Sequence, residues 1–218
     1  MKKKTKSFKF WTSEDVENTF DIKRQKNLPA LTEWLDASGI VLSKETLSIL
    51  DVLKDELLEY IEYLNEEELK VRFIGKIINL VRFDYLGRYR TFFGRQLTAE
   101  TDEYILSGEV DFMVATGKMV PKQPFFFLHE YKQELKRDND PLGQLLIAMV
   151  AAQTRNENDN PVFGCYVTGR LWFFVVLEGK NYSVSNGYNS SDADLTTIVT
   201  LLTKNKKYIE EQMVKLGL

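Results

Sequence analysis

Two short segments of the sequence carry the side chains best suited to chemistry. They are Gly108-Glu-Val-Asp111 and Leu128-His-Glu130-Tyr-Lys132. Both lie in stretches whose apolar patterning predicts β-strands, and side chains two residues apart on a strand point to the same face. Glu130 and Lys132 should therefore share a face, and Asp111 should lie on the neighbouring strand of a hairpin. We expect the three charged groups to converge at one edge of a sheet.

Two carboxylates beside an amine could support metal-assisted hydrolysis. Carboxylates suit a hard cation such as Mg²⁺, which lowers the pKa of a bound water and neutralises charge on a phosphate. A lysine can orient or deprotonate the attacking water and stabilise the pentavalent phosphorus. A structural alternative stays open, in which Asp111 and Lys132 form a buried salt bridge and Glu130 lies at a solvated strand end.

An acidic residue two positions before a lysine is a weak signal by itself. The chain contains the pattern five times: Asp21/Lys23, Glu68/Lys70, Glu130/Lys132, Glu134/Lys136 and Glu178/Lys180. Of these, Glu130/Lys132 alone ends an apolar strand that has a hairpin partner bearing an aspartate. Charges in that position cost desolvation free energy unless they are paired or bound to metal. The context therefore favours Glu130/Lys132.

Hydrophobic periodicity predicts the elements that position these residues. A helix capped by Ser43 is followed by a restart near Asn65, with an apolar stripe at Leu69, Phe73, Ile77 and Val81. Further helices are expected after Thr12 or Ser13, at 28–37, at 142–154 with Asp140 as N-cap, and at 192–216. Strands are expected at 91–97, 103–116, 124–133, 162–167, 171–177 and 181–185.

The predicted fold class is α/β (α+β), with a mixed central sheet flanked by helices. The first three strands should form a meander, and the apolar helix after them should be a buried crossover into a parallel strand. In the second strand, Val110, Phe112 and Val114 should alternate with Asp111, Met113 and Ala115. Residues 1–61 are expected to form an N-terminal helical extension and residues 62–218 the core.

Composition excludes several classes of site. The 218 residues carry a net charge of -3, one cysteine and one histidine, so neither a disulfide framework nor a His-rich zinc site can form. No Walker A, G-x-S-x-G or G-x-G-x-x-G motif occurs, and nothing supports a Cys165–His129 dyad. The lysine-rich start lacks an apolar region and is not a secretory signal, and no apolar run could span a bilayer. We expect a cytoplasmic protein with a disordered N-terminal tail.

The order of Asp111, Glu130-Tyr-Lys132 and a helix starting near Gln144 resembles the PD-(D/E)XK nuclease superfamily, over about residues 62–168. The resemblance implies a restriction-endonuclease-like αβββαβ core and a Mg²⁺ or Mn²⁺ ion bound by Asp111 and Glu130. It implies that Lys132 acts on the attacking water. It also implies a further glutamate on the helix before the first strand, for which we choose Glu66 over Glu67 and Glu68.

The resemblance also places a glutamine on the following helix, where Gln144 stands. The sequence departs from the family pattern at two positions. Val110 stands in place of the nominal proline, and Ala148 stands where exonuclease-type members often carry an aromatic residue.

Basic residues between 69 and 96 predict a nucleic-acid contact. This stretch contains a single acidic residue, Asp84, and seven basic residues: Lys70, Arg72, Lys76, Arg82, Arg88, Arg90 and Arg95. Local positive charge attracts phosphate backbones, and we select Arg82, Arg88 and Arg90 for that role. Tyr85, Tyr89, Phe92 and Phe93 are interleaved, and we expect the phenylalanines to be core residues.

The partner would be nucleic acid, DNA in the first instance, with a homodimer as one arrangement. The rival interpretation is an inactive nuclease-like fold that binds nucleic acid or protein.

Overall fold

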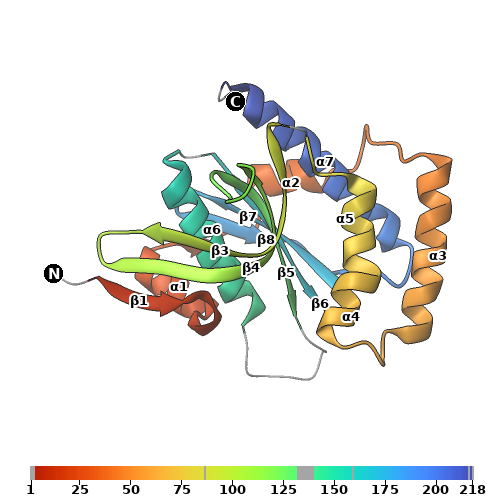
Figure 1. Ribbon diagram of the computed structural model, residues 1–218, viewed down its shortest axis with the longest axis horizontal. Coiled ribbons are helices and arrows are strands. Elements are labelled where there is room, and N and C mark those ends of the chain that lie inside the picture. Colours follow the sequence, from red (N-terminus) through yellow and green to blue (C-terminus); the bar gives the residue numbers. More distant parts are fainter. Residues whose placement is uncertain (1–2, 86, 132–139, 159, 216, 218) are drawn as a thin grey trace.

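The computed structural model describes residues 3–85, 87–131, 140–158, 160–215 and 217. Within these ranges the chain forms one mixed sheet covered by helices on both faces (Figure 1). The predicted α/β class, with a mixed sheet flanked by helices, is confirmed. The helices, with their bounds, are α1 (Ser13–Phe20), α2 (Pro29–Leu35), α3 (Lys44–Tyr60), α4 (Glu66–Leu69), α5 (Gly75–Val81), α6 (Pro141–Asn156) and α7 (Asp194–Lys215). The strands are β1 (Lys4–Ser7), β2 (Lys23–Arg24), β3 (Tyr89–Glu100), β4 (Tyr104–Thr116), β5 (Pro124–Tyr131), β6 (Val162–Thr168), β7 (Leu171–Glu178), β8 (Asn181–Val184) and β9 (Tyr188–Asn189).

The strand order is β1-β4-β5-β6-β7-β8-β2, with β3 paired to β4 and β9 to β7. Antiparallel pairing of β3, β4 and β5 gives the expected meander. Strand β6 pairs with β5 in parallel, as the predicted crossover through α6 requires. Because β3 follows β4 along one edge, β1 and β5 occupy successive stretches of the other edge.

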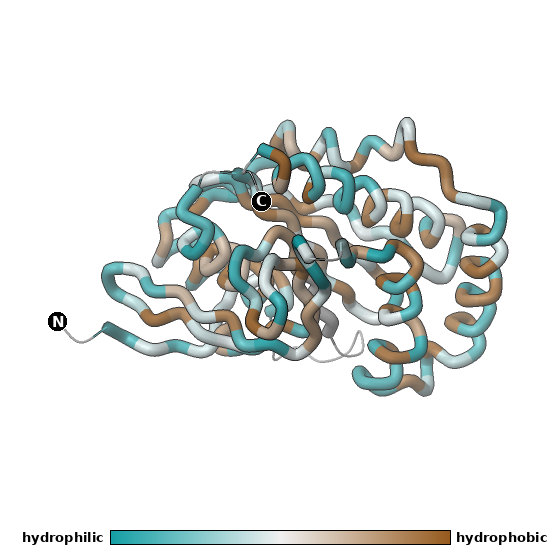
Figure 2. Tube along the Cα trace, turned by 45° about the horizontal axis from the view of Figure 1, so that its top comes forward, coloured by the Kyte–Doolittle hydropathy of each residue, from teal (hydrophilic) through white to brown (hydrophobic). Residues whose placement is uncertain are grey.

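Two hydrophobic cores lie on the two faces of the sheet. The α6-side core packs η1 (Phe8–Phe10), α1 and α6 against one face, and the α7-side core packs α2 to α5 and α7 against the other. Strand β5 serves both cores, since Phe126 and Phe127 are each 0% exposed on opposite faces. Figure 2 shows hydrophobic residues along the central strands and alternating hydrophobic and hydrophilic bands on the peripheral helices.

Helix starts follow the predicted capping residues. Thr12 and Asn65 each form a capping box, and the Ser43 side chain accepts from the backbone N–H of Thr46. The restart near Asn65 is therefore confirmed, as is the buried stripe that contains Phe73 and Ile77. Helix α4 continues without a break through the π-helical segment η2 (Lys70–Ile74) into α5.

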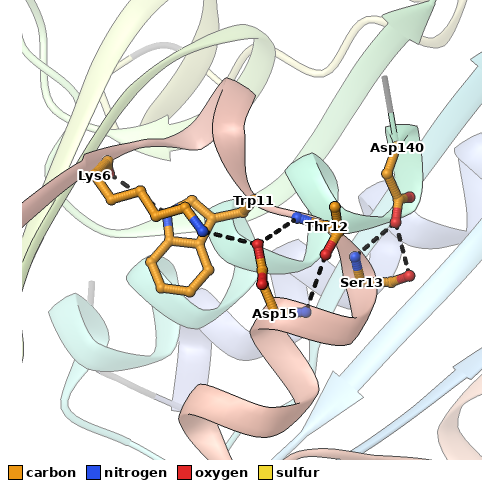
Figure 3. Close-up of polar contacts among 6 residues, drawn as sticks. All are labelled: Lys6, Trp11, Thr12, Ser13, Asp15 and Asp140. Atoms are coloured by element: carbon orange, nitrogen blue, oxygen red, sulfur yellow. Dashed lines mark hydrogen bonds and ion pairs between the residues drawn. The ribbon is translucent and has the colours of Figure 1, made fainter. Parts of the chain in front are cut away.

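The N-terminal segment differs from the expected disordered tail. Lys4–Ser7 forms β1 in parallel with Tyr104–Ser107 of β4. The Lys6 ammonium lies 2.8 Å from the Asp15 carboxylate and 4.2 Å from the centre of the Trp11 ring. Figure 3 shows the side chains of Lys6, Trp11 and Asp15 side by side. An ion pair and a cation–π contact thus help to order this segment, although its lysines had suggested a disordered, solvated tail. Residues 1–61 supply β1 and β2 to the sheet as well as helices, while the boundary at residue 61 stays a prediction.

Asp140 joins the N-terminal segment to the start of α6 (Figure 3). Its Oδ1 accepts from the Gly143 N–H at 2.8 Å and caps the helix. Its Oδ2 accepts from the backbone N–H of Ser13 at 2.6 Å and from the Ser13 hydroxyl at 2.7 Å. A Cβ on Gly143 would lie 2.4 Å from the Thr12 carbonyl carbon, so α1 and α6 approach too closely for another residue.

We expect Asp140→Ala to destabilise the protein by about 2–3 kcal/mol, because it removes an N-cap and a charge-assisted contact together. For a chain of this length, thermal unfolding should occur roughly 5–10 °C lower. Differential scanning calorimetry would measure the shift. Asp102→Ala, at an exposed position, is the control and should change the unfolding temperature little. Equal unfolding temperatures for both variants would contradict this role for Asp140.

Candidate active site

The structure brings three of the predicted acidic positions to one region of the sheet. The β4–β5 ladder begins at Phe112, which pairs with Leu128. Asp111 immediately precedes this ladder on β4, and Glu130 lies two residues beyond it on β5. Helix α4, which carries Glu66, lies near the same end of the sheet, because Lys70 contacts both Glu66 and Asp111.

Asp111 faces the α7-side core because β4 departs from regular alternation. Val110 packs in the α6-side core, whereas Phe112 and Val114 pack in the α7-side core, so the expected alternation is wrong between 110 and 112. Gly94 of β3, which lies opposite Asp111, has a φ of +54°. The paired residues of the β3–β4 ladder include neither Gly94 nor Asp111. This irregularity turns Asp111 toward α4.

Glu130 occupies a register position that belongs to the same face. Its backbone pairs with Val167 of β6, and Leu128 pairs with Cys165. Val167 and Cys165 both lie in the α7-side core. Alternation along β5 from Phe126 gives the same assignment of position. Lys132 lies outside the described residues.

Lys70 links the acidic residues of α4 to β4. Its Nζ lies 3.1 Å from Oδ1 of Asp111, 3.1 Å from Oε1 of Glu66 and 3.2 Å from Oε1 of Glu67. The side chains of Lys70, Glu66 and Asp111 are each about one quarter exposed. Burial alone would lower the pKa of Lys70, but the carboxylates of Asp111 and Glu66 outweigh it and raise that pKa. We call these four residues the Lys70 cluster.

The three glutamates of α4 have different environments. Glu68 completes the capping box by accepting from the Asn65 N–H at 2.9 Å. Glu67 is 79% exposed, whereas Glu66 is 25% exposed and shares its ammonium partner with Asp111. Of the three, Glu66 therefore has the position best suited to act with Asp111.

Sequence reasoning missed Lys70 as a site residue. It noted Lys70 only as one of several basic residues and as the second member of the weak Glu68/Lys70 pattern. The available signal was the spacing of Glu66 and Lys70, four residues apart on one helix face. Lys70 also opens the π-helical turn of η2, a local geometry that is frequent at functional sites.

The remaining predicted contacts lie elsewhere. Gln144 is 8% exposed on α6, which covers the other face of the sheet. Arg82 ends α5 in the left-handed conformation and lines a depression with Ser43 and Glu45. Arg88 and Arg90 line a different groove, which does not include Arg82.

The aromatic residues near these arginines are divided between core and surface. Phe92 is 2% exposed, as expected for a core residue. Phe93 is 55% exposed, and its assignment to the core is wrong. Its ring packs against that of Phe112, with the two centroids 5.2 Å apart. Phe93 precedes Gly94, whose positive φ disturbs the alternation of side chains along β3.

A cysteine nucleophile finds no support. Cys165 is 0% exposed, and burial raises the pKa of its thiol well above the ordinary value. A buried thiol with a raised pKa supplies little of the reactive thiolate.

The carboxylates of the Lys70 cluster have the chemistry that a divalent cation needs. Oxygens of Asp111 and Glu66 contact the same nitrogen, so they are separated by no more than twice 3.1 Å. Such hard oxygen donors fit Mg²⁺ or Mn²⁺. Within the described part of the chain, no group of three or more His, Cys, Asp or Glu residues is arranged to hold a metal ion.

The described part also contains no helix long and apolar enough to cross a membrane.

No protein-family model matches the sequence, and no curated protein matches it.

Proposed function

We propose that the protein is a metal-dependent nuclease of the PD-(D/E)XK type, with a restriction-endonuclease-like core formed by α4–α5, the β3–β4–β5 meander, α6 and β6. The support is the order of these elements and the parallel β5–β6 pairing through α6. The single observation that carries the proposal is that Asp111 and the backbone of Glu130 lie at one end of the β4–β5 ladder, where Lys70 contacts Asp111.

In this proposal Asp111 and Glu130 would hold a Mg²⁺ or Mn²⁺ ion, and Glu66 lies on α4 beside Asp111. The bound cation would lower the pKa of a water and neutralise charge on the scissile phosphate. Lys132 orients the attacking water or takes its proton. The water oxygen bonds to phosphorus as the bond from phosphorus to the leaving oxygen breaks, and that oxygen takes a proton from solvent water to leave as an alcohol. The substrate is nucleic acid, DNA in the first instance.

A second function is favoured by one specific observation. The Lys70 ammonium already lies between Asp111 and Glu66, where it neutralises carboxylates that the nuclease proposal assigns to a metal site. If Lys70 permanently takes the place of the metal, the protein would be an inactive nuclease-like fold that binds nucleic acid or protein. The two functions differ in whether a divalent cation can displace that ammonium.

Cleavage assays would test the nuclease proposal directly. We expect labelled single-stranded and double-stranded DNA and RNA to include a substrate that is cut with Mg²⁺ or Mn²⁺ and preserved with EDTA. Asp111→Asn, purified in parallel, controls for contaminating nucleases and should abolish the cleavage. Cleavage that persists in Asp111→Asn would contradict the proposal. Failure to cut any of the four substrates would favour the binding function.

A further inference from the structure

A large groove lies at the end of the sheet away from the Lys70 cluster. One wall is formed by the loop from Asp84 into β3, and the other by the β4–β5 turn at 117–123. Arg155 of α6 and Met213 of α7 complete the lining. The volume is about 1400 Å³, above the range of roughly 300–1000 Å³ for sites that enclose a small molecule. Such a groove suits a chain-like ligand.

The groove is strongly basic in a protein whose net charge is -3. Among the described residues that line it, five side chains are basic and one, that of Asp84, is acidic. The Asp84 carboxylate accepts from the backbone N–H of Thr91 at 2.8 Å and is thereby engaged with β3. The basic residues are Arg88, Arg90, Lys118, Lys122 and Arg155. Concentrated positive charge of this kind is complementary to a phosphate backbone.

Two of the arginines fix the walls in place. Arg90 donates through Nη1 to the carbonyl of Lys118 at 3.1 Å, which connects β3 to the turn. Arg155 donates through Nη2 to the carbonyl of Pro121 at 2.9 Å. Gly117 has a φ of +105°, and a Cβ there would meet the carbonyl oxygen of Val120 at 2.2 Å. The turn is therefore held in a definite shape, with Lys118 and Lys122 exposed on it.

An exposed aromatic ring distinguishes the groove from a simple basic patch. Tyr85 is 48% exposed, and its ring lies 6.0 Å from that of Tyr89 at an interplanar angle of 30°. The Arg88 guanidinium lies 5.4 Å from the centre of the Tyr85 ring. A ring and a cation presented together can stack on an unpaired base while neutralising its phosphate. Bases within a duplex already stack on their neighbours, so this platform favours a single strand.

We propose that the groove binds single-stranded nucleic acid, with phosphates at Arg88, Lys118 and Lys122 and a base on Tyr85. This inference rests on the proposed function, because it specifies the form of the nucleic acid. Thr116 at the groove lies five residues along β4 from Asp111, or about 17 Å. A strand bound in the groove and cut near Asp111 must cover at least that distance.

Fluorescence anisotropy in EDTA would measure binding without any cleavage. The probes are a labelled 12-nucleotide DNA, the same sequence as RNA, and the matched DNA duplex. We expect at least one single strand to bind roughly tenfold more tightly than the duplex, and the two single-stranded probes identify which sugar is preferred. Arg88→Ala with Lys122→Ala should weaken binding roughly tenfold and reduce the salt slope by about 1.4.

Stacking is tested separately from charge. Tyr85→Ala should weaken single-strand binding roughly 5- to 100-fold, while Tyr85→Phe keeps the ring and should bind nearly as wild type. The matched charge control is Lys26→Ala with Lys44→Ala, two exposed lysines outside the groove. Thermal unfolding of every variant establishes that it is folded.

The result separates this inference from the nuclease proposal. Single-strand binding that depends on Arg88, Lys122 and Tyr85, without cleavage in Mg²⁺, would support the groove and reject the nuclease. Equal binding of duplex and single strand would overturn the groove assignment, even if the protein cuts nucleic acid. An equal loss of affinity in the groove pair and the control pair would overturn it as well.

Discussion

Lys132→Ala should lower the rate of phosphodiester cleavage by about 10²- to 10⁴-fold and leave the fold intact. A side chain that orients or deprotonates the attacking water typically contributes a factor of this size. Folding should be preserved because the sequence predicts Lys132 near the end of a strand, where a charge contributes little to the core. Single-turnover cleavage with saturating Mg²⁺ measures the chemical step, and thermal unfolding shows whether stability is unchanged.

Lys23→Ala is the matched control for Lys132→Ala. Asp21 and Lys23 repeat the acid-x-lysine spacing at an exposed site, where Lys23 is 69% exposed and 3.7 Å from Asp21. This variant should cleave at the wild-type rate. Equal rates for wild type, Lys23→Ala and Lys132→Ala would remove Lys132 from the mechanism. A loss of rate accompanied by unfolding would instead assign Lys132 the structural salt bridge that the sequence left open.

Local patterns predicted the elements of the fold well, because caps and hydrophobic stripes are local properties. Asp140, Asn65 and Ser43 open helices as expected. The apolar α6 implied a crossover, and a crossover connection is what joins two parallel strands, here β5 and β6. Strand β1 was missed because its pairing partner, Tyr104–Ser107 of β4, lies far along the sequence and no local pattern specifies that pairing.

The candidate site was only partly predictable, for the same physical reason. The strand positions of Asp111 and Glu130 follow from alternation and pairing, but the turn of Asp111 toward α4 depends on the irregularity opposite Gly94. Lys70 lies 41 residues before Asp111 in the sequence. Its contact with Asp111 is produced by the packing of η2 on the sheet, which no local spacing specifies.

Lys70→Met should make the protein's stability depend on divalent cations. Removing the ammonium leaves Asp111, Glu66 and Glu67 without the positive charge that now lies between them. In EDTA we expect a loss of about 1–3 kcal/mol in the free energy of unfolding, less than for a fully buried pair because these groups are partly exposed. Mn²⁺ at 100 times its dissociation constant should restore about 2.7 kcal/mol.

The comparison with Lys76→Met decides between the two proposed functions. Lys76, on α5, pairs with Glu56 at 2.6 Å and does not belong to the Lys70 cluster. Its replacement should give no Mn²⁺-dependent gain beyond that of the wild type. A large Mn²⁺ shift confined to Lys70→Met would mean that the carboxylates hold a divalent cation and that Lys70 competes with it. If Lys70→Met is destabilised and Mn²⁺ does not restore its stability, the cluster requires the lysine and holds no metal. That result would support the inactive fold that binds nucleic acid or protein.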